Sequence, residues 1–115
     1  MPKSYKYRVA LSLLDVTGLE YVKDFRISLS PGEIIVGGRS TEAQFPVDDD
    51  NASRKHFFFD VKFEQVYIND MKSKNGVFLN NKRVQSSAIS LNDFITIGHL
   101  TYLVKSIKKT LAASA

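Results

Sequence analysis

Apolar and polar side chains alternate with a period of two over long stretches of this chain. Between residues 5 and 13 every odd position is apolar, while the even positions carry Lys, Arg, Ala and Ser. Because successive side chains of a strand point to opposite faces, this alternation predicts a half-buried β-strand. Residues 21–29 repeat the pattern and predict a second strand.

The stretch from residue 56 to residue 63 is rich in phenylalanine. It predicts a strand whose buried face is formed by Phe57, Phe59, Val61 and Phe63. Neighbouring rings of this run must face opposite sides of a sheet, so we interpret them as core residues and not as a stacking platform.

Shorter apolar runs, separated by turn residues, fill the rest of the chain. The runs predicted as strands are residues 33–36, 66–68, 77–79, 82–84, 94–97 and 101–105. Asn80-Asn81 predicts a two-residue hairpin turn because Asn tolerates positive φ, and residues 40–52 are expected to form a loop. With about ten or eleven short strands and no amphipathic helix of useful length, the predicted fold is all-β, an antiparallel sandwich.

Composition limits the class of protein. The 115 residues suffice for one domain with a single core, and 43% of them are hydrophobic, as in a globular chain. There is no cysteine, hence no disulfide and no zinc site built on Cys. No apolar run is long enough to span a membrane, and the first residues lead into a strand pattern and not a signal peptide. A nuclear or cytoplasmic location is expected.

Three polar clusters stand where strand patterns end, which places them on loops. They are Gly38-Arg39, Ser53-Arg54-Lys55-His56 and Ser73-Lys74-Asn75-Gly76. Loops held by a β scaffold commonly carry binding sites.

The side chains of these clusters suit a phosphorylated peptide. Arg39 can bind an oxyanion with its planar fork, Ser53 can donate a hydrogen bond, and Arg54 and Lys74 add positive charge. Asn75 offers both a donor and an acceptor, which suits the backbone of an extended peptide. Together they favour a doubly charged tetrahedral anion on a peptide as ligand.

The clusters also stand in a recognisable order. Along the chain the series is Gly38-Arg39, Ser53-Arg54-Lys55-His56, Asp70, Ser73-Lys74-Asn75-Gly76, Asn80 and Ile97-Gly98. In order and spacing this series resembles a forkhead-associated (FHA) domain, a β-sandwich that binds phosphothreonine peptides with loops at one end. The resemblance covers residues 1–106. Residues 107–115 are expected to be a tail that frays, forms a short helix or joins further protein.

The resemblance implies a role for each matching residue. Arg39 and Ser53 would hold the phosphate, Arg54 would add a charge-assisted contact, and Lys74 would lie beside the phosphate. Asn75 would bond the peptide backbone.

Four further residues, by the same resemblance, would be structural at the site: Gly38, His56, Gly76 and Asn80. Two positions depart from the family pattern. Gly37 replaces an aliphatic residue and is expected to loosen the strand end, while Asn81 replaces glycine and is an acceptable turn residue.

A threonine-phosphorylated protein is therefore the expected partner, recruited in kinase signalling at DNA-damage, cell-cycle or transcription control. No cofactor or metal is expected. The sequence leaves the parent protein and the oligomeric state open, with a monomer favoured.

Catalysis is disfavoured, because nothing arranges a base and an orienting acid around Ser53 and His56. The run Asp48-Asp49-Asp50 lacks the alternating ligands and the final Glu of a calcium loop.

Two binding alternatives stay open. A phosphate-independent docking domain could use a lateral face of the same sandwich, and binding of one peptide with and without phosphate separates that case. The net charge of +4 allows nucleic-acid binding, but basic residues are dispersed along the chain. Direct nucleic-acid binding is therefore the weaker alternative, and salt-dependent binding to duplex DNA tests it.

Overall fold

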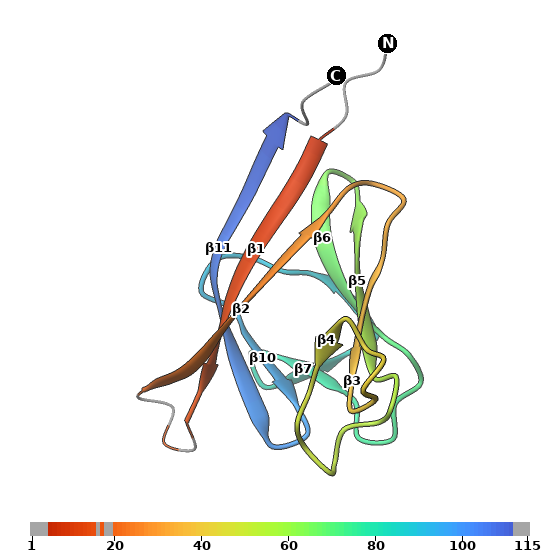
Figure 1. Ribbon diagram of the computed structural model, residues 1–115, viewed down its shortest axis with the longest axis vertical. Helices are drawn as coiled ribbons and strands as arrows, with labels where there is room; N and C mark the ends of the chain where they lie inside the picture. Colours follow the sequence, from red (N-terminus) through yellow and green to blue (C-terminus); the bar gives the residue numbers. More distant parts are fainter. Residues whose placement is uncertain (1–4, 16, 18–19, 112–115) are drawn as a thin grey trace.

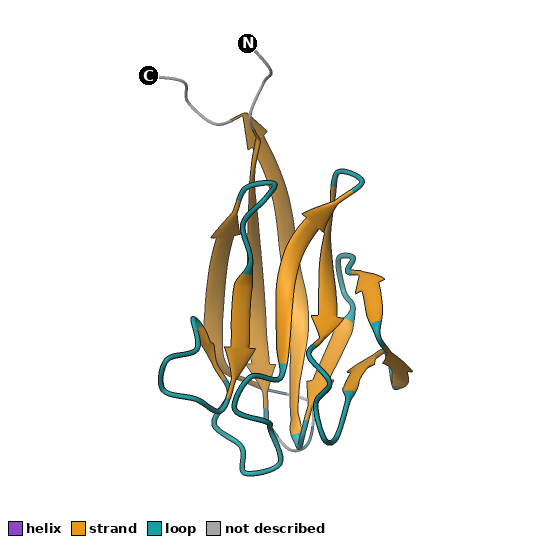
Figure 2. Ribbon diagram, turned by 90° about the vertical axis from the view of Figure 1, so that its right-hand side faces the viewer, coloured by secondary structure: helices purple, strands orange, loops and turns teal. Residues whose placement is uncertain are grey.

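The computed structural model describes residues 5–15, 17 and 20–111, and this part of the chain contains strands and loops but no helix (Figure 1, Figure 2). The strands are β1 (Tyr5–Leu14), β2 (Tyr21–Leu29), β3 (Ile35–Gly38), β4 (Phe45–Pro46), β5 (Phe57–Lys62), β6 (Gln65–Asp70), β7 (Val77–Leu79), β8 (Lys82–Val84), β9 (Ser86–Ala88), β10 (Phe94–Ile97) and β11 (Leu100–Leu111). Within the described ranges no helical segment could cross a membrane.

Two sheets pack face to face as a sandwich, which confirms the predicted fold class. One sheet has six strands in the order β2-β1-β11-β10-β7-β8, and the other has five in the order β4-β3-β5-β6-β9. The loops after β3, between β4 and β5, and between β6 and β7 gather at the lower end of the molecule in Figure 1. We call this region the loop end.

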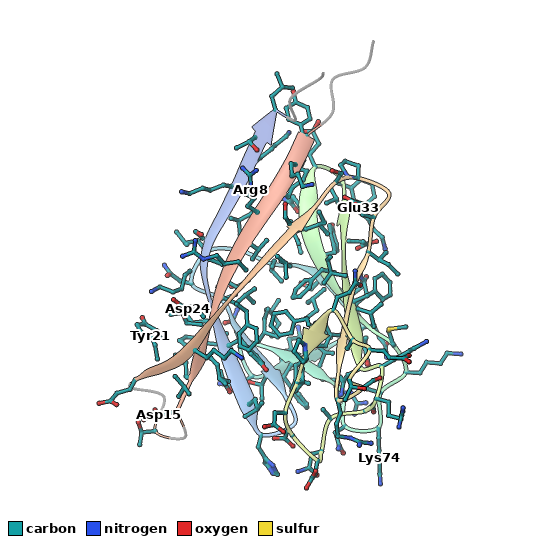
Figure 3. The ribbon with its side chains drawn as sticks, viewed as in Figure 1. Arg8, Asp15, Tyr21, Asp24, Glu33 and Lys74 are labelled. Atoms are coloured by element: carbon teal, nitrogen blue, oxygen red, sulfur yellow. The ribbon has the colours of Figure 1, made fainter. Side chains whose placement is uncertain are left out.

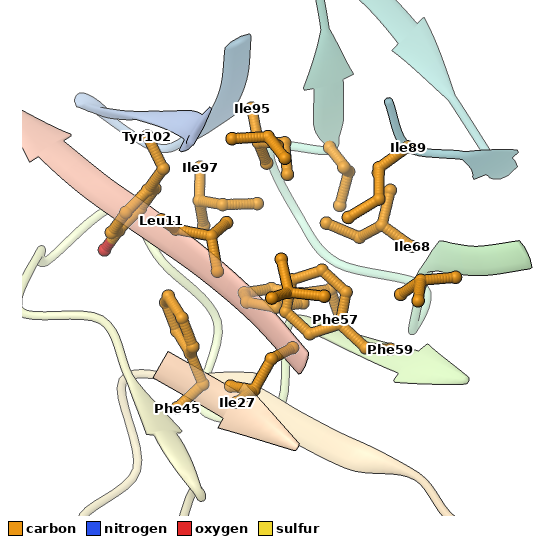
Figure 4. Close-up of a cluster of buried hydrophobic side chains, with 14 of the residues drawn as sticks. Leu11, Ile27, Phe45, Phe57, Phe59, Ile68, Ile89, Ile95, Ile97 and Tyr102 are labelled. Carbon is orange, nitrogen blue, oxygen red and sulfur yellow. The ribbon is translucent and has the colours of Figure 1, made fainter. Parts of the chain in front are cut away.

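Aromatic and aliphatic side chains fill the space between the sheets (Figure 4). The ring of Phe45 lies 5.7 Å from that of Phe57, 6.0 Å from that of Phe59 and 5.3 Å from that of Tyr102, in edge-to-face geometry. These four residues are at most 2% exposed. Such pairs stabilise a core beyond the effect of apolar burial alone.

Phe45 also explains a difference from the predicted loop. It belongs to the two-residue strand β4, which pairs with β3 in parallel, so the sandwich is not wholly antiparallel. Burial of the Phe45 ring brings its backbone beside Gly37 and Gly38, where Val47 donates its N–H to Gly38 O at 2.8 Å.

The prediction for Phe63 was wrong. Lys62 pairs with Gln65, so Phe63 and Glu64 form the two-residue turn between β5 and β6, with φ of 51° and 59°. The Phe63 side chain is consequently 86% exposed, while Phe57 and Phe59 lie in the core as expected. Asn80 and Asn81 do form the predicted turn with positive φ.

The predicted tail was also wrong for residues 107–111. They continue β11, with Ile107 opposite Val9 and Leu111 opposite Tyr5. The long β1 supplies the backbone partners that allow β11 to continue. Residues 112–115 lie outside the described part of the chain, as do Val16 and residues 18–19.

Two other strands differ from prediction. The strand expected at residues 33–36 begins two residues later, and Ile34 is 50% exposed. The short β9 had no predicted counterpart; it pairs with β6 through Ser86, Ser87 and Ala88.

Candidate functional site

Backbone hydrogen bonds bring the predicted clusters together at the loop end. Arg39 N–H donates to Ser53 O at 2.9 Å, and Ser40 N–H donates to Arg54 O at 3.1 Å. Lys74 N–H donates to Ser53 Oγ at 3.1 Å. The segment around Ser53 thus lies between the end of β3 and the loop that follows β6.

Gly38 permits the close approach of the first two segments. A Cβ at Gly38 would lie 2.2 Å from Arg54 O, a backbone atom that cannot move aside without displacing the loop. Any larger residue at position 38 would therefore clash with the backbone of this loop.

Gly37, the departure from the family pattern, has a different explanation. A Cβ there would lie 2.2 Å from the end of the Phe57 ring. The Phe57 ring occupies the space of the missing side chain, and it is only 1% exposed. The Phe57 ring therefore packs against the end of β3, whereas the sequence predicted that Gly37 would loosen this strand end.

His56 is fully buried beneath the loops and connects them. Its Nδ1 accepts the N–H of Ser53 at 2.9 Å, and its Nε2 donates to Gly76 O at 2.7 Å. This pair of bonds requires the tautomer with its proton on Nε2. Its backbone adds two bonds, from its own N–H to Gly37 O and from Met71 N–H to its O.

Arg39 is exposed and held at one point of its guanidinium. Its Nε donates to Ala52 O at 3.1 Å. No ion pair with a described residue involves this guanidinium. An arginine fixed through Nε still presents its two terminal NH₂ groups as donors for an anion.

Ser53 and the two neighbouring cations complete a positively charged surface. Ser53 Oγ accepts from Lys74 N–H, so its own O–H is left to donate elsewhere. The side chains of Arg54 and Lys74 are exposed, and neither forms an ion pair with a described residue. Lys74 lies at the lower end of Figure 3.

Asn75 is anchored across the loop end. Its Nδ2 donates to Asn51 O at 2.7 Å, which leaves Oδ1 and the second amide hydrogen for a ligand. The following Gly76 has φ of +87° and donates its N–H to Ser73 Oγ at 2.9 Å. Ser73 N–H is in turn held by Asp70 Oδ1 at 3.0 Å.

Asn80 lies elsewhere. It follows β7 at the end opposite Gly76, where its Oδ1 accepts from Phe94 N–H and its Nδ2 donates to Asp93 Oδ1. These bonds hold the β7–β8 turn to β10, whereas the sequence placed Asn80 as a structural residue of the binding site.

Sequence reasoning missed three contributors to the site. The carbonyl groups of Asn51 and Ala52 fix Asn75 and Arg39, and backbone acceptors carry no residue-type signal. Arg83 lies against Gly76, since a Cβ there would approach its Nε within 2.6 Å. The three residues of β8 are too few for the sequence to indicate that this side chain reaches the loop.

Asp49 holds two backbone N–H groups in the loops. Its carboxylate accepts the N–H groups of Asn51 at 2.7 Å and His99 at 3.0 Å. Burial acts to raise the pKa of Asp49, but these hydrogen bonds outweigh it, and the pKa lies below its ordinary value. The described residues contain no group of acidic, His or Cys side chains that could hold a metal.

Comparison with known proteins agrees with this arrangement. A model of the FHA domain matches residues 35–98, more than half of the chain. FHA domain-containing protein FhaA of Mycobacterium tuberculosis is 32% identical over 97 residues, or 84% of this chain, but the chain spans only 17% of that protein.

Two solved structures show the same sandwich. The FhaA FHA domain complexed with the intracellular domain of Rv3910 is 30% identical, covers 84% of this chain and 99% of its own, and has a TM-score of 0.68. A domain from a structural and functional analysis of phosphothreonine-dependent FHA domain interactions is 29% identical, with coverages of 86% and 96% and a TM-score of 0.69. The chain belongs to the FHA domain family, a family of non-catalytic binding modules.

Proposed function

We propose that this FHA domain binds phosphothreonine-containing segments of partner proteins at its loop end. The observation that carries the proposal is the pairing of Arg39 and Ser53. Each is fixed by a backbone group, Ala52 O for the guanidinium and Lys74 N–H for the hydroxyl oxygen, and each keeps donors for a ligand.

The charge balance of the surface supports a phosphate. A phosphorylated threonine carries about −1.5 to −2 charges and three acceptor oxygens near neutral pH. Arg39 supplies a two-pronged donor, and Arg54 and Lys74 supply further positive charge that no described carboxylate neutralises by direct pairing. The carboxylate of Asp49 is occupied by two backbone N–H groups.

Asn75 recognises the part of the peptide outside the phosphate group. Its anchor on Asn51 O fixes the amide, so that the remaining donor and acceptor can bond the backbone of an extended segment. Contacts with the backbone contribute affinity whatever the peptide sequence. The preference for threonine over serine is carried over from the family, which provides a niche for the γ-methyl group.

The biological setting we propose is recruitment of proteins by serine/threonine kinase signalling. The FhaA relative is mycobacterial, and the solved FhaA domain is bound to an intracellular domain. These relatives favour a cytoplasmic setting, and they give no support to the nuclear, DNA-damage or cell-cycle context expected from the sequence. Partners and activities of any longer protein are part of the same proposal.

The test is a screen of a peptide library with phosphothreonine at a fixed position and degenerate flanking residues. The same library carrying unphosphorylated threonine is the control. We expect enrichment only from the phosphorylated library, and a consensus that the Arg39→Ala variant fails to select. Equal selection from both libraries would contradict the proposal.

A further inference from the structure

A second group of cations lies on the outer face of the six-stranded sheet, away from the loop end. It surrounds a hollow of about 410 Å³ lined by Arg8, Val9, Ala10, Arg26, Ile27, Ser28, Ser106 and Lys108. Figure 3 separates Arg8 from Lys74 along the long axis of the molecule. The hollow therefore belongs to the sheet face and not to the site described above.

Strand register explains how the hollow forms. Ala10 of β1 pairs with Arg26 of β2 and with Ser106 of β11. Paired residues of antiparallel strands point to the same face, so small side chains at Ala10 and Ser106 leave a depression beside the Arg26 guanidinium.

The next row of the sheet adds two more cations. Arg8 pairs with Ser28 on β2 and with Lys108 on β11. Paired residues lie about 5 Å apart and diagonal ones about 7–8 Å apart, so three long cationic side chains reach one small region above Ala10. The intervening Val9 is 1% exposed and Ile27 is 8% exposed, which confirms that the cations point outward.

These cations lack partners within the part of the chain that the structure describes. The ion pairs found there involve Lys62, His99 and Lys109, and none involves Arg8, Arg26 or Lys108. The nearest carboxylate along β2, that of Asp24, accepts the hydroxyl hydrogen of Ser12 at 2.6 Å. Three clustered positive charges without a counterion favour an anion from outside.

We propose that this hollow, defined by Arg8, Arg26 and Lys108 around Ala10, docks a short acidic segment of a partner protein. Two arginine forks and one ammonium match one or two carboxylates, and the hydroxyls of Ser28 and Ser106 add donors. The floor of the hollow is concave and formed by small residues, so it can accept a protruding side chain. A lipid surface is flat and would not enter it. A duplex would need a longer cationic track, but the row beyond Arg26 holds the Asp24 carboxylate.

The probe for this proposal is an unphosphorylated peptide of alternating Asp and Glu, followed by amide NMR of the whole chain. Without a phosphothreonine, the probe does not depend on the function proposed for the loop end. We expect saturable shifts at residues 8–10, 26–28 and 106–108, and none with a matched Asn/Gln peptide.

Two variants with equal charge loss separate the hollow from the net charge. Arg8→Gln/Arg26→Gln should weaken binding by about fivefold to tenfold, the size expected for two exposed ion pairs. Lys62→Gln/Lys82→Gln, on other strands, should leave it unchanged.

Three results would overturn the proposal. The first is the absence of saturable shifts at low ionic strength. The second is an equal loss in the two charge-matched variants, which would reduce the effect to diffuse attraction. The third is tighter binding, dependent on Arg8 and Arg26, to phosphatidylserine vesicles or to duplex DNA. That result would assign the hollow to a membrane or a nucleic acid.

Discussion

The loop end and the outer hollow both present arginines to solvent, but they hold them differently. At the loop end, Arg39 is fixed by Ala52 O and stands beside a serine whose oxygen is fixed by Lys74 N–H. In the hollow, the side chains of Arg8 and Arg26 project from a sheet, and their guanidinium groups form no ion pair with a described residue. Donors that are already fixed lose less conformational entropy on binding. We therefore expect the loop end to select ligands by the geometry of their acceptor oxygens, and the hollow to select ligands by their charge.

The largest expected effect is on binding at the loop end. Arg39→Ala should weaken phosphothreonine-peptide binding by roughly 2–5 kcal/mol, because it removes one partner of a partly desolvated charge pair. Arg39→Lys should recover only part of the loss, since lysine lacks the planar fork. Calorimetry on the folded variants measures this, and Arg8→Ala is the control that should bind like the wild type. Similar losses for Arg39→Ala and Arg8→Ala would erase the distinction between the two regions.

The second effect is on stability. His56→Ala leaves the half-buried Ser53 N–H and the buried Gly76 O without their partners, and each unsatisfied buried group costs about 1–3 kcal/mol. We expect the free energy of unfolding to fall by roughly 2–4 kcal/mol and phosphopeptide affinity to fall with it. Chemical denaturation checks the first expectation, with Arg8→Ala as a surface control. An unchanged midpoint would show that the loops do not depend on this histidine.

A third effect tests how the site is supported. Gly37→Val restores the aliphatic residue of the family pattern but places it against the Phe57 ring. Overpacking of this kind costs about 1–3 kcal/mol. Phe57→Leu should be destabilising alone and should offset part of the Gly37→Val penalty in the double variant. Additive losses in the double-mutant cycle would show that the ring and the glycine are not complementary.

The fourth effect concerns Asn75. Asn75→Ala should weaken several unrelated phosphopeptides by a similar factor, equivalent to roughly 0.5–1.5 kcal/mol for a lost hydrogen bond. Titration of peptides with different flanking residues measures it. An effect confined to one peptide would mean that Asn75 contacts a side chain.

The smallest expected effect is on pH dependence. The pKa of Asp49 is lowered in the folded state, so its carboxylate stabilises the fold above its unfolded pKa of about 3.9. That contribution is lost as the pH falls below about 4 and through the folded pKa. Asp49→Asn removes the titrating charge and keeps an acceptor oxygen for only one of the two N–H groups, those of Asn51 and His99. The variant should therefore be less stable near neutral pH and should show a flatter acid limb of the stability curve. An unchanged acid limb would rule out Asp49 as its source.

Alternation predicted the strands whose inward positions are all apolar. It failed at Phe63, because the turn there contains neither Gly nor Asn and the apolar pattern continues through it. It also failed beyond Ser106, where the ammonium of Lys109 lies over the ring of Tyr5 at 4.3 Å. Lys109 stands at a position where the alternation requires an apolar residue, so the sequence pattern of the strand is interrupted there.

The site was predictable to a similar extent. Arg39, Ser53 and Asn75 carry side-chain chemistry that can be read from residue type and order, and the structure brings them together. Their anchors are the carbonyl groups of Ala52 and Asn51, which every residue type possesses. Tertiary structure alone reveals which carbonyl holds which side chain.

The central claim is that the loop end binds a phosphate and not merely a peptide. The most direct test is calorimetric titration of the wild-type domain with one library-selected peptide in three forms, bearing threonine, phosphoserine or phosphothreonine. We predict measurable binding of the phosphothreonine form, weaker binding of the phosphoserine form and no measurable binding of the unphosphorylated form. Equal affinity for the threonine and phosphothreonine forms would contradict the claim and would identify the domain as a phosphate-independent docking module.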